Sequence, residues 1–204
     1  ISGQLKATAG SVWLNGADIS RLSVAQRTAR GIGRAFQLTN LFPNLTVREN
    51  VRLVVQAKAG RGFDIFSMAD SHAELVERAE HVLAQVRLLD AADQRVTALP
   101  HGDQRKLEVA LLIALQSDVL MFDEPTAGMS VDEVPVILEL IRGLKADATK
   151  TILLVEHKME VIRSLADRII VLHNGRLVAD GAPQEVIASP IVQEAYLGVE
   201  AAHG

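Results

Sequence analysis

The sequence has 204 residues, of which 49% are hydrophobic and 23% are charged, and its formal net charge at pH 7 is −4. This length and composition exclude a disordered chain and fit one compact domain, alone or with a small subdomain. No face-length cluster of Lys and Arg occurs, so no nucleic-acid partner is expected, and no apolar run reaches the roughly 18 to 20 residues of a membrane-spanning helix.

Short-range signals predict three elements in the first part of the chain. The dipeptide Asn15-Gly16 follows an alternating apolar segment and readily takes the positive φ angles of a tight hairpin. Ser23 is a suitable N-cap for a short helix that ends at Gly31. Residues 32–36 then predict a buried strand that stops at Gln37.

The next part of the chain is predicted to be helical. Thr46 and Glu49 have the spacing of a capping box, which opens a helix ending close to a glycine. Apolar residues then recur at helical spacing from about residue 69 to 86, and a further helix is expected from Asp103 to Leu115. Together these elements predict a helical subdomain over residues 46–116.

After this subdomain, apolar strands alternate with helices. The predicted strands are 119–122, 151–155, 169–172 and 177–179, the predicted helices are 134–145 and 159–165, and a turn is expected at Asn174-Gly175. Such alternation argues for an α/β fold with a mainly parallel sheet covered on both faces by helices and interrupted by the helical insertion. In this scheme residues 1–204 form one domain, in which residues 117–182 complete the core and residues 183–204 form a C-terminal helical tail.

Polar residues follow three of the predicted strands, at Gln37, at Asp123-Glu124 and at Glu156-His157. Ligands bind beyond the carboxyl ends of the strands in parallel sheets, so these side chains are candidates for a site. Two acids after an apolar strand suit magnesium-assisted phosphoryl transfer, because one carboxylate holds the metal's water shell and its neighbour orients an attacking water. His157 suits a hydrogen-bond donor to a terminal phosphate, and Gln37 suits a ligand of the metal or of its water.

Each of these residues also has a plainer interpretation. The acids before Pro125 can cap a strand with solvated charge, a histidine after a strand is often structural, and a glutamine at a loop edge is often just solvated. The order and spacing of the three positions favour the phosphoryl-transfer interpretation.

Five segments resemble, in order and spacing, the motifs of an ABC ATPase, and the match spans nearly the whole chain. Gln37 resembles the Q-loop glutamine, residues 120–124 resemble the Walker B motif, and His157 resembles the switch histidine. The segment that resembles the signature motif consists of Leu99, Pro100, His101, Gly102, Asp103 and Gln104. The segment at the place of the D-loop consists of Ala127, Gly128, Met129 and Ser130. The signature helix and the D-loop segment also resemble those of importers of branched-chain amino acids and related amides.

The resemblance implies a P-loop NTPase-like subunit that uses ATP and Mg²⁺. ATP would be sandwiched between this chain and a second ABC ATPase subunit, each site using the signature segment of the opposite subunit. Within a site, Gln37 and Asp123 would bind Mg²⁺, Glu124 would polarise the attacking water and His157 would contact the γ-phosphate. The segment Gln37 to Leu45 would contact transmembrane permease subunits, which would hold the protein at the cytoplasmic face of the membrane.

The sequence departs from the family pattern in two places. It contains no G-x-x-x-x-G-K-[ST], so the backbone cradle and lysine for the β- and γ-phosphates are missing, and weak ATP binding is expected of the chain as written. We interpret this as the loss of roughly two dozen or more upstream residues. Pro100 also stands where the family usually has Ser, which removes a hydroxyl that would contact the γ-phosphate across the dimer and cap the following helix.

Two other functions are compatible with part of the pattern. One is a catalytically silent module that pairs with an active ATPase, which the missing phosphate loop favours. The other is a soluble ABC protein of DNA repair or translation, which is disfavoured by the acidic net charge and by the lack of a long coiled-coil insertion.

Overall fold

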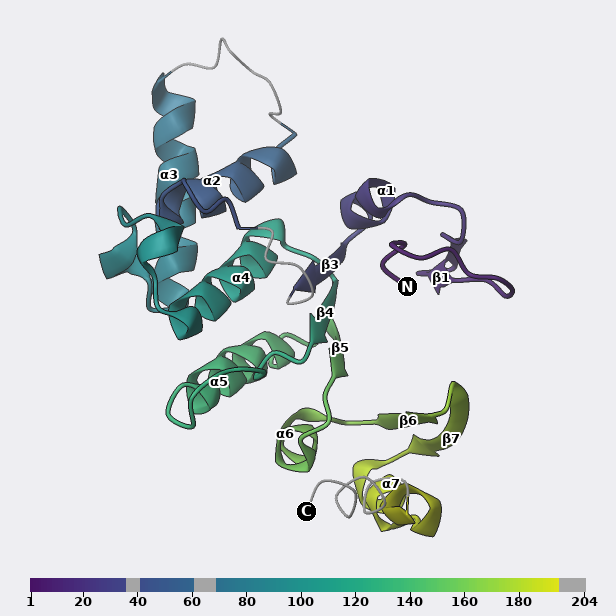
Figure 1. Cartoon of the computed structure of the whole chain (residues 1–204). Helices are drawn as coiled ribbons and strands as arrows, with labels where there is room; N and C mark the ends of the chain where they lie inside the picture. Colours follow the sequence, from purple (N-terminus) through teal and green to yellow (C-terminus); the bar gives the residue numbers. More distant parts are fainter. Residues whose placement is uncertain (36–40, 61–68, 195–204) are drawn as a thin grey trace. The chain divides into compact units, whose positions relative to one another are not determined.

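The structure is a computed structural model that describes residues 1–35, 41–60 and 69–194 (Figure 1). The chain forms two compact units, Ile1–Val155 and Glu156–Gly204. The division into residues 46–116, 117–182 and 183–204 that the sequence suggests stays a prediction.

The first unit begins with a short hairpin of β1 (Trp13–Leu14) and β2 (Ala17–Asp18), which pair antiparallel with Trp13 opposite Asp18. Asn15 and Gly16 in the turn have φ angles of 50° and 76°, so the hairpin prediction is confirmed. Helix α1 (Val24–Ala29) follows, and Ser23 caps it through a capping box with Gln26, as its sequence position predicts.

A three-stranded parallel sheet forms the centre of the first unit. Its strands are β3 (Ile32–Ala35), β4 (Val119–Asp123) and β5 (Thr151–Val155), in the order β3-β4-β5. Ala35 lies opposite Phe122 and Asp123 lies opposite Val155, so all three strands run the same way and end at one edge (Figure 1). The parallel sheet expected from the alternation of apolar strands and helices is therefore confirmed.

The strands are less buried than continuous apolar runs predict. In β4, Leu120 and Phe122 are buried, whereas the alternating residues Val119, Met121 and Asp123 are partly exposed. In β5, Val155 is 53% exposed. Within the described residues β5 pairs only with β4 and is an edge strand, which accounts for the exposure of Val155.

Helices α2 (Val47–Lys58), α3 (Ala69–Gln85) and α4 (His101–Leu115) pack against one another, and α4 also contacts β3 (Figure 1). Two short 3₁₀ helices, Leu89–Ala91 and Val96–Ala98, connect α3 to α4. The buried apolar side chains at this packing include Val51, Leu83 and Leu107. The amphipathic pattern that predicts α3 is thus explained by its packing against α2 and α4.

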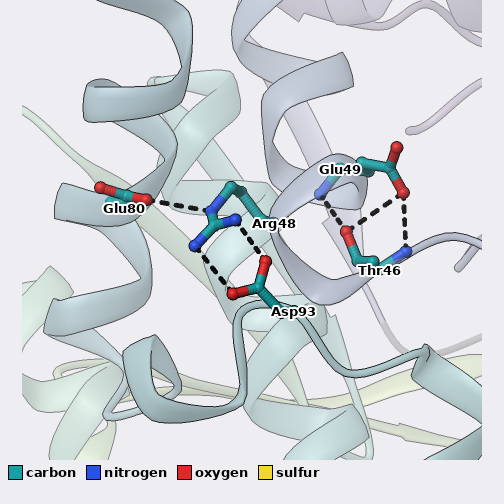
Figure 2. Close-up of polar contacts among 5 residues, drawn as sticks. All are labelled: Thr46, Arg48, Glu49, Glu80 and Asp93. Atoms are coloured by element: carbon teal, nitrogen blue, oxygen red, sulfur yellow. Dashed lines mark hydrogen bonds and ion pairs between the residues drawn. The ribbon is translucent and has the colours of Figure 1, made fainter. Parts of the chain in front are cut away.

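The start of α2 is held by polar contacts that the capping-box prediction captures in part (Figure 2). Thr46 Oγ1 accepts a hydrogen bond from the Glu49 N–H at 3.1 Å, while Glu49 Oε2 accepts one from the Thr46 N–H at 3.0 Å. Arg48 forms ion pairs with Glu80 of α3 and with Asp93, so its guanidinium joins α2, α3 and the connection before α4. The first turn of α2 therefore has partners both within the helix and across the subdomain.

Helix α4 begins two residues earlier than its sequence predicts. Pro100 takes the N-cap position with φ −55° and ψ 155°, and His101 and Gly102 already belong to the helix. The predicted start at Asp103 is wrong because a proline just before a helix fits this backbone conformation and does not delay its first turn. Helix α5 (Val134–Lys145) has Pro135 in its first turn, as predicted, and buries Ile137 and Ile141.

The second unit contains α6 (Met159–Leu165), β6 (Ile169–His173), β7 (Arg176–Gly181) and α7 (Pro183–Ala188). Strands β6 and β7 form an antiparallel hairpin around Asn174 and Gly175, whose φ angles are 50° and 74°. The predicted turn is confirmed, and within the described residues the hairpin forms a two-stranded sheet. In the described part of the chain, no helix has both the length and the apolar character needed to cross a membrane.

Candidate functional site

The backbone turns sharply at the carboxyl end of β4. Asp123 is the last residue of the strand, and the Glu124 N–H donates a hydrogen bond to the Val155 carbonyl at 2.9 Å. Glu124 itself has a φ of 48°, in the left-handed region that residues with a β-carbon rarely adopt. Such backbone conformations cluster at active sites and ligand-binding sites, and here one falls on the residue predicted to polarise water.

Asp123 is paired with a cation of the neighbouring strand. Arg34 Nη2 lies 3.0 Å from Asp123 Oδ2, and both side chains are 22% exposed. Arg34 Nη1 also donates hydrogen bonds to Ser2 Oγ, at 3.2 Å, and to Gln4 Oε1. The guanidinium therefore connects the carboxylate at the end of β4 with the first residues of the chain.

The signature segment, residues 99–104, forms the start of α4. The Gln104 N–H donates to the Pro100 carbonyl and the Gln104 side-chain amide donates to the Leu99 carbonyl, both at 3.0 Å. Asp103 Oδ1 accepts from Lys106 Nζ at 2.7 Å. Pro100 supplies no side-chain cap, so the hydroxyl that a serine would place there has no counterpart.

The structure brings the signature segment beside the D-loop segment, residues 127–130, of the same chain. Glu133 Oε2 accepts hydrogen bonds from the Ser130 N–H at 3.0 Å and from the Ser130 hydroxyl at 2.9 Å. A β-carbon built on Gly102 would lie 2.0 Å from Glu133 Oε1, and one built on Gly128 would lie 3.6 Å from His101 Cε1. A side chain at position 102 would therefore have to displace the Glu133 carboxylate.

The electrostatics around Glu133 follow from these contacts. The hydrogen bonds from the Ser130 backbone and hydroxyl lower the pKa of the Glu133 carboxyl, with smaller contributions from the nearby His101 and Lys106. The carboxylate therefore stays ionised beside the first turn of α4. A negative charge at that place is favourable to the helix, whose amino-terminal N–H groups carry partial positive charge.

The structure describes all the other predicted site residues except Gln37. Ala127 and Met129 are partly exposed, and Glu124 is exposed. His157 is an exposed residue of the second unit, and its N–H donates to Glu156 Oε2 at 3.2 Å. Gln37 lies outside the described residues. The predicted convergence of Gln37 and His157 on the end of β4 stays a prediction.

Three functional candidates were missed by sequence reasoning. Arg34 had a signal, because a charged residue inside an apolar strand needs a partner. Glu133 had one too, since Ser130 and Glu133 have the spacing of a capping box. Glu108 is 5% exposed on α4 and is bound by Arg105 at 2.9 Å, and burial raises the pKa of its carboxyl. No local pattern marks Glu108 as buried.

The end of β4 has donor chemistry that fits Mg²⁺. Among the described residues, no group of three or more His, Cys, Asp or Glu side chains could hold a metal by itself. Mg²⁺ does not need such a group, since it is commonly bound through one or two carboxylates together with substrate phosphates and waters. Asp123 already faces one cation, the Arg34 guanidinium, which shows that this carboxylate is placed to neutralise positive charge.

Comparison with protein-family models supports a nucleotide-binding function. The model described as "ABC transporter" matches residues 1–127, and the model described as "Branched-chain amino acid ATP-binding cassette transporter" matches residues 176–202. The chain is also 34% identical over 203 residues to the high-affinity branched-chain amino acid transport ATP-binding protein LivG of Escherichia coli (strain K12). That alignment covers 97% of this chain and 80% of LivG.

Solved structures with the same fold are ATP-binding cassettes. The ADP conformation of one such cassette is 25% identical, with a TM-score of 0.77, and the match covers 96% of this chain and 80% of that one. A dimeric cassette in a post-hydrolysis state bound to ADP and Pi is 26% identical, with a TM-score of 0.74, over 90% of this chain and 77% of that one. The α/β fold of this chain is thus that of the P-loop NTPase class.

Proposed function

Since the chain belongs to the ABC transporter family, we propose that it is the ATP-hydrolysing subunit of an importer for branched-chain amino acids or related small polar solutes. The observation that carries the proposal is the end of β4, where Asp123 faces a cation and Glu124 takes a strained backbone conformation. The substrate class is supported by the LivG similarity and by the family model that matches residues 176–202.

We assign distinct roles to the two acids. Asp123, together with Gln37, would hold Mg²⁺, which would offset negative charge on the phosphates of ATP. Glu124 accepts a hydrogen bond from the attacking water and orients it toward the γ-phosphate. His157 donates a hydrogen bond to the same phosphate. The left-handed backbone at Glu124 supports a functional role for this residue, because such conformations cluster at active sites.

The signature and D-loop segments form the surface for a second ATPase subunit. Their side-by-side position in one chain, with Gly102 and Gly128 both close to neighbouring groups, supports a common contact surface. ATP closes the two subunits on each other, and hydrolysis reopens them. The segment Gln37 to Leu45 transmits this movement to transmembrane permease subunits, which hold the protein at the cytoplasmic face of the membrane.

The proposal is tested by ATP hydrolysis of the full-length gene product with Mg²⁺. Glu124→Gln keeps the size of the side chain and removes its charge, so we expect turnover to fall at least a hundredfold, within the range of effects of general bases. The matched control is Glu139→Gln, because Glu139 is an exposed acid of the same unit that pairs with Arg87. Equal turnover in all three proteins would remove Glu124 from the mechanism, and no turnover in the wild type would favour the silent module.

A further inference from the structure

We propose that Arg34 is a positioning residue whose guanidinium acts as an internal cation and holds the Asp123 carboxylate. Mg²⁺ has to displace this guanidinium in order to bind Asp123. The inference rests on the proposed function of Asp123 as the metal carboxylate. It adds a residue outside the motifs that the sequence resemblance identifies. The expected consequence is that Arg34 sets the affinity of the site for a divalent cation.

The geometry of the sheet places the two side chains on one face. In the parallel register Arg34 lies opposite Met121, so it faces the same side of the sheet as Asp123, two residues further along β4. Met121 and Asp123 lie on the partly exposed face of β4, opposite the buried Leu120 and Phe122. The 3.0 Å ion pair is therefore built into the strand register.

Arg34 keeps other hydrogen-bond partners when the Asp123 carboxylate turns away from it. A guanidinium has five N–H donors, and Nη1 is held by Ser2 Oγ and Gln4 Oε1 while Nη2 points at Asp123 Oδ2. Asp123 can therefore exchange partners without leaving the whole guanidinium unsatisfied. This arrangement suits a carboxylate that alternates between an internal cation and a metal.

Competition between Arg34 and a divalent cation for the Asp123 carboxylate changes the metal affinity in one direction only. A positive charge in contact with a carboxylate neutralises it and also repels a second cation, so the ion pair weakens divalent binding. Both side chains are partly exposed, so solvent moderates the effect. A pair that served only to join β3 and β4 would change stability when removed and would leave the metal affinity of Asp123 unchanged.

The test is a titration of the full-length gene product with Mn²⁺ alone, followed by electron paramagnetic resonance at low ionic strength and without nucleotide. Arg34→Met keeps the stem of the side chain and removes the charge, and we expect it to tighten Mn²⁺ binding about tenfold, as loss of one charge-assisted contact predicts. Arg34→Lys keeps the charge but loses the fork, so it is expected to tighten binding only about twofold to threefold. Arg87→Met is the control, because Arg87 pairs with the exposed Glu139.

The Asp123→Asn variant distinguishes the proposed metal role of Asp123 from the proposed role of Arg34. If Asp123→Asn abolishes the Mn²⁺ site and Arg34→Met strengthens it, the inference is supported. If Asp123→Asn abolishes the site but Arg34→Met binds Mn²⁺ like the wild type, or not at all, the inference is overturned and the metal role of Asp123 stands. If Mn²⁺ binding survives Asp123→Asn, the proposed metal role fails and the inference fails with it. Should Arg34→Met not fold, the same comparison is made with Arg34→Lys.

Discussion

Replacing Pro100 with serine tests how the signature helix is capped. The structure places Pro100 at the N-cap of α4, where its carbonyl accepts a hydrogen bond from the Gln104 N–H at 3.0 Å. The N–H groups of Gly102 and Asp103 are those that an N-cap side chain normally satisfies. A serine hydroxyl at position 100 is therefore expected to accept a hydrogen bond from one of them.

Two opposing contributions set the size of the effect. A serine cap contributes about 1 kcal/mol relative to a residue without a capping side chain. Removing a proline from a compatible position costs about 0.4 to 1 kcal/mol, because the unfolded chain regains conformational freedom. The two nearly cancel, so Pro100→Ser alone is expected to change the free energy of unfolding by a few tenths of a kcal/mol.

The informative comparison is between Pro100→Ser and Pro100→Ala, because both variants lose the proline ring and only serine can cap. We expect the serine variant to be more stable by about 1 kcal/mol, which for a chain of this size corresponds to about 2–4 °C in Tm. Urea denaturation followed by circular dichroism measures the difference. Equal stabilities for the two variants would contradict the capping argument. If the hydroxyl also contacts the γ-phosphate, the ATPase rate rises in the serine variant and not in the alanine variant.

Two further predictions concern the surroundings of Glu133 and of Glu108. Gly102→Ala places a β-carbon 2.0 Å from Glu133 Oε1 and displaces the Glu133 carboxylate from Ser130. We therefore expect this substitution to lower the urea midpoint of the wild-type protein and to have a smaller effect in the Glu133→Ala variant. Additive effects of the two substitutions would refute this coupling. Burial raises the pKa of the Glu108 carboxyl, so its contribution to stability is present below the ordinary carboxyl pKa and is lost as the pH rises through the pKa of the folded state. Glu108→Gln should therefore stabilise the protein more at pH 7 than at pH 4. Urea midpoints at the two pH values measure this, and a pH-independent difference would contradict it.

Local signals in the sequence predicted much of the secondary structure. Asn15-Gly16 and Asn174-Gly175 marked both hairpins, because few other dipeptides take two consecutive positive φ angles. Ser23 and Thr46 marked two helix starts, since their hydroxyls cap the N–H groups of the first turn. These features depend on residues three or fewer positions apart and so can be read without the fold.

What the sequence did not show depends on contacts between distant segments. Arg34 and Asp123 are 89 residues apart, and their ion pair exists because β3 and β4 are neighbours in register. Glu133 approaches Gly102 only because α4 and the start of α5 lie together.

The most direct test of the account is the retention of ATP by the Glu124→Gln variant of the full-length gene product. Protein incubated with labelled ATP and Mg²⁺ is passed through a desalting column, and the bound nucleotide is identified as ATP or ADP. If Glu124 orients the attacking water while Asp123 holds the metal, the variant retains unhydrolysed ATP, whereas Asp123→Asn retains little nucleotide. Retention of ADP by Glu124→Gln, at the level found with the wild type, would contradict the assignment of the nucleotide chemistry to the end of β4.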